Sequence, residues 1–102
     1  MPTRPSQNDP ERVTAWATHR HSVGRTIREL RLARGLTQEA LALHSGVTRN
    51  VLIDVESGRR GLLYERLFDL ADALGVPASQ LLDTDTNTDS ASTRRAAEDD
   101  LA

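Results

Sequence analysis

The sequence lacks cysteine and lysine, and it has one Trp, one Tyr and one Phe among its 102 residues. Without cysteine the chain can form neither a disulfide framework nor a zinc ribbon. With so few rings, its core must come from Leu, Val, Ile and Ala. No segment approaches the ~18 apolar residues of a membrane span. The first residues, MPTRPSQNDPERV, lack the hydrophobic run of a signal peptide. The composition therefore predicts a small, soluble, cytoplasmic domain.

Patterns typical of catalysis and metal binding are also missing. The three histidines are His19, His21 and His44. Only the first two are close in sequence, and residues two apart on a helix point to different faces, which does not suit a metal ion. Short helices with scattered acids and no cysteine offer no nucleophile or acid–base group in a pocket. We therefore expect no metal, no cofactor and no enzymatic activity.

Charge and composition divide the chain into three parts. The net charge is −2, but residues 19–82 hold nine Arg against seven acidic residues, whereas residues 83–102 carry −4. This last part, DTDTNTDSASTRRAAEDDLA, has almost no large apolar residue and cannot offset the entropy of ordering. We expect a partly helical extension at residues 1–21, a mildly basic domain at residues 22–82 and a disordered acidic tail at residues 83–102.

Helix signals fill the middle of the chain. Asp9, Pro10 and Glu11 give a cap, a preset φ and an acid in a first turn, which predicts a helix from Pro10 to about Arg20. Beyond it, apolar residues recur every three or four positions, and glycines or Thr caps separate the segments. Five further helices are expected: residues 22–34, about eight residues after Thr37, residues 49–57, residues 62–74, and a short helix opened by Pro77 at a first-turn position and ending at Leu82. No segment shows the alternation of a strand.

The stretch GVTRNVLIDVESGRRG, residues 46–61, contains the most apolar run of the chain with an acid inside it. At about 100° per residue, the helix after Thr48 has two faces. Val51, Leu52 and Val55 lie on one face and close a core. The opposite face presents Arg49, Asn50, Ile53, Asp54 and Ser57. Side chains of these types recognise bases: Arg contacts guanine, Asn contacts adenine, a carboxylate contacts the cytosine amino group, and an apolar tip contacts the thymine methyl. This face therefore predicts recognition of bases.

This stretch and its surroundings resemble a known family. Six residues stand where the helix-turn-helix pattern has its first polar residue, its small helix-contact residue, its turn glycine and its three core residues: Gln38, Ala42, Gly46, Val47, Leu52 and Val55. With IRELRLARGLTQEALA, ESGRR and LADALGVPASQLL, residues 23–82 are similar to the Cro/CI-type (XRE family) DNA-binding domain. The resemblance implies an all-α, five-helix, lambda-repressor-like domain, here with an extra N-terminal helix, whose third helix lies in the major groove.

Carried over by position, the resemblance assigns nine residues to DNA. They are Gln38, Thr48, Arg49, Asn50, Ile53, Asp54, Ser57, Arg59 and Arg60. Gln38 matches a residue that touches phosphate or braces the base-contacting side chains. Arg49, Asn50 and Asp54 match positions that contact bases.

Other basic residues are expected around this surface. The candidate phosphate contacts are Arg59 and Arg60 after the third helix, followed by Arg25 and Arg28. Arg31 and Glu56 match a pair that in several family members is a buried ion pair between the first and third helices. Such a pair is structural and is not part of the site.

Two departures from the family pattern leave alternatives open. Ile53 and Asp54 stand where the family usually has polar and often basic residues. Asp54 would repel phosphate unless it accepts a bond from cytosine or from a nearby donor. Asn50, one turn earlier, is such a donor. The loop after Arg60 is GLLY, and its Leu62 and Leu63 either cap the core or form part of a dimer contact.

The N-terminal helix and the first domain helix share one apolar stripe. Its members are Val13, Trp16, Val23, Ile27 and Leu30, with the aliphatic stem of Arg20 between them. Either Trp16 packs locally over the edge of the domain, or the stripe belongs to a long or paired helix that helps dimerisation.

Two classes of function fit these features. The first is a sequence-specific regulator of transcription, acting as a repressor, that binds double-stranded DNA as a homodimer at a palindromic or repeated operator. The second is a module for a protein partner, such as an antitoxin, in which a terminal segment folds on another protein. Neither class involves a membrane.

Overall fold

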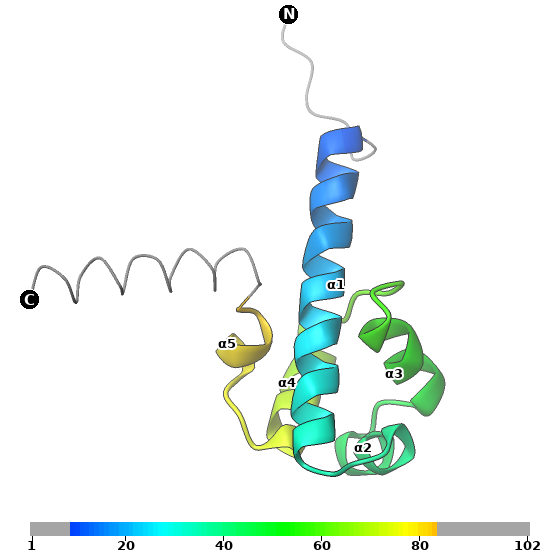
Figure 1. Ribbon diagram of the computed structural model, residues 1–102, viewed down its shortest axis with the longest axis vertical. Coiled ribbons are helices and arrows are strands. Elements are labelled where there is room, and N and C mark those ends of the chain that lie inside the picture. Colours follow the sequence, from blue (N-terminus) through cyan, green and yellow to red (C-terminus); the bar gives the residue numbers. More distant parts are fainter. Residues whose placement is uncertain (1–8, 84–102) are drawn as a thin grey trace, which may run out of the picture.

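The computed structural model of the chain describes residues 9–83, and all regular structure within this range is α-helical (Figure 1). The helices are α1 (Pro10–Ala33), α2 (Gln38–Ser45), α3 (Arg49–Glu56), α4 (Tyr64–Leu74) and α5 (Ala78–Leu81). The predicted acidic tail, apart from Asp83, lies outside the described residues, as do residues 1–8.

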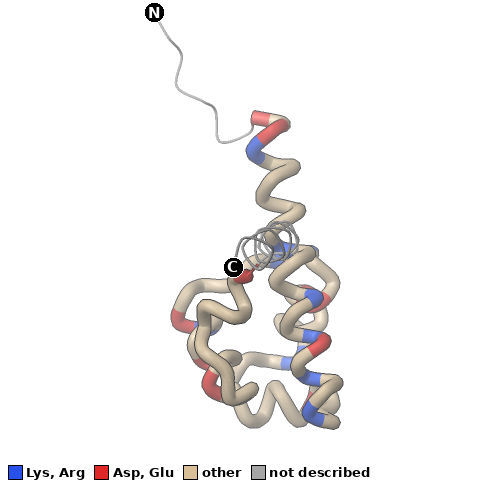
Figure 2. Tube along the Cα trace, turned by 60° about the vertical axis from the view of Figure 1, so that its left-hand side comes forward, with Lys and Arg blue, Asp and Glu red and all other residues tan. Residues whose placement is uncertain are grey.

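α1 joins two segments that the sequence pattern treats separately. Asp9 caps it, because the Glu11 backbone N–H donates to Asp9 Oδ1 at 2.9 Å. No proline interrupts the chain between Arg20 and Ala33, and the helix runs through. The predicted extra N-terminal helix is therefore the first half of α1. This half projects beyond the other helices in Figure 1, and Figure 2 shows charged residues in its first turn followed by a stretch without charge.

Caps and left-handed glycines set the ends of the short helices as predicted. Thr37 Oγ1 accepts the Ala40 N–H at 3.0 Å where α2 begins. Gly46 ends α2 with φ 79°, and Gly75 ends α4 with φ 72°. Residues other than glycine rarely adopt this left-handed backbone conformation. Pro77 differs from the prediction, since it stands at the N-cap of α5 and not inside its first turn.

The core is built of aliphatic side chains that all five helices and one turn contribute. Its buried members are Ile27, Leu41, Val47, Leu52, Val55, Leu67, Leu70, Ala71, Leu74 and Leu81. α1 packs on α3, and α4 packs on α2 and α5. Gly24 allows α1 to approach α3 closely, because a Cβ at this position would overlap the Val55 carbonyl oxygen. α3 is thus fixed by α1 on one side and keeps its other side toward the surface.

Candidate DNA-binding surface

The turn between α2 and α3 sets the direction of α3. Only Gly46, Val47 and Thr48 separate the two helices. Gly46 supplies the left-handed conformation, and the buried Val47 anchors the turn in the core. Thr48 Oγ1 accepts the Val51 N–H at 3.3 Å and caps α3. The first turn of α3 is therefore held at a fixed angle to α2 by a left-handed residue, a buried side chain and a cap.

α3 has the two faces that the sequence predicts. Leu52 and Val55 are buried, and Val51 is half-buried against the core. On the other face, Arg49 and Asn50 are exposed, while the remaining predicted side chains are half-buried: Ile53, Asp54 and Ser57. Figure 1 shows α3 at the outer edge of the fold, across α1 from α5. The five side chains of the predicted DNA-facing side thus share the outward side of α3 and its C-cap.

Asp54 is paired with Arg59. Its Oδ1 accepts a bond from Arg59 Nη2 at 3.0 Å, and the two side chains are 36% and 64% exposed. The sequence offers Asn50 as a nearby donor for Asp54, but among the described residues no bond joins Asn50 to Asp54. The reason is the turn after α3, where Gly58 has φ 78° and the Arg59 N–H donates to the Asp54 carbonyl at 2.9 Å. This turn brings Arg59 back beside the last turn of α3, which partly neutralises the carboxylate.

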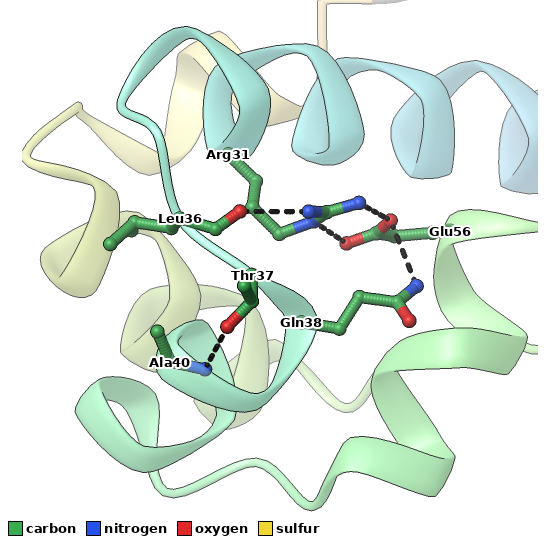
Figure 3. Close-up of polar contacts among 6 residues, drawn as sticks. All are labelled: Arg31, Leu36, Thr37, Gln38, Ala40 and Glu56. Carbon is green, nitrogen blue, oxygen red and sulfur yellow. Dashed lines mark hydrogen bonds and ion pairs between the residues drawn. The ribbon is translucent and has the colours of Figure 1, made fainter.

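A buried polar network links α1, α2 and α3 (Figure 3). Arg31 Nε donates to Glu56 Oε2 at 2.8 Å and Arg31 Nη2 to Glu56 Oε1 at 2.9 Å, with side chains only 9% and 4% exposed. The expected structural ion pair is therefore present and bidentate. Arg31 Nη1 also donates to the Leu36 carbonyl at 2.8 Å. Gln38 Nε2 donates to Glu56 Oε1 at 3.2 Å, which holds Gln38 beside α3 at the start of α2.

A polar groove of about 460 Å³ lies beside this network. Its lining residues come from three helices and the turn after α3: Arg28, Arg31, Gln38, Ile53, Glu56, Ser57 and Arg59. Arg28 and Arg59 are exposed, whereas Arg31 is neutralised by Glu56. The groove opens beside the outward face of α3, and its two cations suit contact with the negatively charged phosphate backbone of DNA. The sequence indicated Arg28 and Arg59 separately, and no spacing rule predicted that they share one groove.

The remaining predicted residues flank this surface. Arg60 is exposed and makes no hydrogen bond or ion pair with the other residues of the range 9–83. Leu62 packs against the core, but Leu63 is 72% exposed, so only Leu62 caps the core. His21 lies against Gly58, where a Cβ would overlap its ring, and among the described residues no three potential ligands gather around a metal position. None of the helices from Pro10 to Leu81 is long and apolar enough to cross a membrane.

Similarities to known proteins cover the same part of the chain. The family model "Helix-turn-helix" (HTH_3) matches residues 27–81. The uncharacterized HTH-type transcriptional regulator y4dJ of Sinorhizobium fredii (strain NBRC 101917 / NGR234) is 40% identical over 63 residues, which are 62% of this chain and 82% of that protein. The cryptic phage CTXphi transcriptional repressor RstR of Vibrio cholerae is 39% identical over 64 residues, 62% of this chain and 58% of the repressor.

A solved structure shares the arrangement of helices. The restriction-modification controller protein C.AhdI from Aeromonas hydrophila matches with a TM-score of 0.60 and 39% sequence identity. The match covers 61% of this chain and 94% of the controller protein. The five-helix, lambda-repressor-like fold expected from the sequence is therefore confirmed.

Proposed function

The chain belongs to the helix-turn-helix family of transcriptional regulators, whose model matches residues 27–81, and we propose that it is a repressor that binds a specific operator as a dimer. One observation carries the proposal: Arg49 and Asn50 are exposed side by side on the first turn of a helix whose opposite face is locked into the core. A helix with this geometry can enter the major groove with its first turn toward the base edges.

Each outward side chain of α3 has a chemically matched target. We assign Arg49 to guanine, because a guanidinium makes two hydrogen bonds to its O6 and N7 atoms. Asn50 suits adenine in the same way, and Ile53 suits a thymine methyl group. Thr48 and Ser57, at the two ends of the helix, are assigned to the DNA backbone or to base edges nearby.

The charged residues around α3 are assigned to the phosphate backbone. Arg59 has five N–H donors and uses one of them for Asp54, so it can hold the carboxylate and a phosphate together. Asp54 is therefore less repulsive to DNA than an isolated acid, and its free lone pairs can accept from a cytosine amino group. Arg28, Arg60 and Gln38 complete the backbone contacts on the two sides of the helix.

A dimer is proposed because one α3 offers too little information. The outward residues of one helix specify only about 4 base pairs, whereas two half-sites about one helical turn apart, ~34 Å, give a usable operator. Similarity to the repressor RstR supports repression of transcription as the proposed mode of regulation. The chain is proposed to act by binding alone, without catalysis and without a cofactor.

Selection of duplexes from a random pool tests this function. The expected result is enrichment of a sequence with two related half-sites about one turn apart. The matched control is the double variant Arg49→Ala, Asn50→Ala, which should keep the fold because both side chains are exposed, and should lose the enrichment. The proposal fails if the unchanged chain enriches nothing, or if the double variant selects the same sequence equally well. A chain that selects DNA only together with a co-purified protein would instead favour the partner module.

A further inference from the structure

The projecting half of α1 carries an apolar stripe on which no other helix of residues 9–83 packs; Arg12, one turn earlier on α1, lies over the Trp16 ring. Val13 is 43% exposed and Trp16 is 39% exposed, and residues 13–18 contain no charge. Both side chains lie on the same face of α1 as Arg20, Val23 and the buried Ile27, at three- and four-residue spacing. The face of α1 that packs on the core therefore continues for about two turns beyond it.

A largely apolar cavity of about 180 Å³ opens on the same face, one turn further along α1. Its walls come from α1, α3, α4 and the two loops nearby: His19, Arg20, Val23, Val55, Arg60, Gly61, Leu62, Leu67 and Leu82. Arg20 stands at the boundary between the stripe and the cavity, where its Nε donates to the Gly58 carbonyl at 3.4 Å. Its aliphatic stem links the two apolar surfaces into one.

The terminal residues of this sequence contain few apolar side chains that could cover these surfaces. Residues 1–8 contain one large apolar side chain, Met1, and residues 84–102 contain one, Leu101. A second copy, by contrast, brings both a stripe and a cavity. Because these lie about one turn apart on the same helix face, an antiparallel arrangement brings the stripe of each copy to the cavity of the other. A surface of this kind is self-complementary, as a two-fold interface requires.

We propose that the chain dimerises through antiparallel pairing of the projecting halves of α1, with the two-fold axis level with Thr18. In this register Trp16 of each copy lies level with Arg20 of the other, and Val13 lies level with Val23. The Trp16 indole of each copy then covers the mouth of the other copy's cavity and stacks on the guanidinium of the other copy's Arg20. Arg12 of the same copy, whose Cζ is 5.1 Å from the ring centroid, also covers the indole. The inference supplies the surface for the dimer in the proposed function and rests on it.

Sedimentation and fluorescence without DNA test the pairing. Trp16 is the one Trp of the chain, so its emission reports on this position alone. We expect the unchanged chain to sediment as a dimer at micromolar concentration, and dilution to the monomer should shift the Trp16 emission to longer wavelength. Val13→Glu places a charge on the stripe and should weaken self-association at least about tenfold, with emission at long wavelength throughout. Far-UV circular dichroism verifies that the variant remains helical.

Phe68→Glu is the matched control. Phe68 is 53% exposed on α4, away from the stripe on α1, and its ring meets the Tyr64 ring edge-on with centroids 6.5 Å apart, so its variant should dimerise as the unchanged chain does. The pairing is overturned if the unchanged chain is monomeric, if Trp16 emission does not follow dissociation, or if Phe68→Glu, and not Val13→Glu, abolishes the dimer. Binding to a single half-site separates the two proposals, because Val13→Glu should keep the base preference of one half-site. Absence of that preference in the unchanged, dimeric chain would instead contradict the proposed function.

Discussion

Removing the charge of Glu56 is expected to destabilise the fold strongly. Glu56 lies almost fully buried opposite Arg31, and it accepts three hydrogen bonds from Arg31 and Gln38. Glu56→Gln keeps the shape but leaves the guanidinium charge buried without a counter-charge. Breaking a buried pair in this way costs about 3–5 kcal/mol. A domain of this size has a total stability of about 4–11 kcal/mol, so the variant should be close to unfolding.

A double variant separates the pair from its surroundings. Arg31→Met with Glu56→Leu replaces both charges by apolar groups of similar size and removes the uncompensated charge. The Leu36 carbonyl then loses the 2.8 Å bond from Arg31, and Gln38 loses its acceptor, so recovery is incomplete. We expect the double variant to be about 1–2 kcal/mol less stable than the unchanged chain, which is a smaller effect than that of Glu56→Gln alone.

Urea unfolding followed by far-UV circular dichroism measures both effects. With a slope of about 1 kcal/mol per molar urea for a small domain, Glu56→Gln should lower the midpoint by about 3–5 M and the double variant by about 1–2 M. The reasoning is refuted if Glu56→Gln changes the midpoint by less than about 0.5 M. It is also refuted if the double variant is less stable than Glu56→Gln.

Three other predictions concern a cap, a helix contact and the tail. Thr37→Ala removes the side-chain cap of α2 and should cost about 1 kcal/mol, or roughly 4–8 °C in melting temperature by calorimetry. Gly24→Ala drives a Cβ into the Val55 carbonyl and should lower the free energy of unfolding more than Gly35→Ala does. At Gly35 a Cβ meets nothing within 4 Å, so that variant loses only about 1–2 kcal/mol for its left-handed backbone. An equal midpoint in urea for the two variants would contradict this. Deleting residues 83–102 removes a net charge of −4 and should raise non-specific DNA affinity modestly at low salt in a fluorescence anisotropy titration. Unchanged affinity would show that the tail does not compete with DNA.

The parts of the fold that the sequence predicted well depend on local chemistry. α2 begins after Thr37 and α3 after Thr48 because both hydroxyls cap a backbone N–H three residues on. Gly46 marks the end of α2 because a left-handed residue is required there. The two faces of α3 follow from helical periodicity. Signals of this kind act over a few residues and are therefore visible in the sequence.

The parts that the sequence did not predict depend on how the chain turns back on itself. Helical spacing offers Asn50 as a donor for Asp54 because it lies one turn away, but the partner is Arg59, which follows the left-handed turn at Gly58. Beyond the end of a helix no fixed spacing relates two side chains. The groove between Arg28 and Arg59 likewise arises only when α1 and the turn after α3 are packed together.

Recognition by α3 is tested most directly by a binding experiment with two variants, Arg49→Ala and Arg60→Ala. Each variant is titrated with a panel of operators that differ by single bases, at two salt concentrations. Arg49 contacting guanine contributes about 1–3 kcal/mol of discrimination, so Arg49→Ala should flatten the preference at one or two positions of each half-site. Arg60→Ala should weaken all operators alike and lower the salt slope by about one unit for each phosphate that a bound chain no longer neutralises. If Arg49→Ala keeps the original ranking of operators and only lowers affinity, Arg49 contacts the backbone, and the outward face of α3 does not recognise bases as proposed.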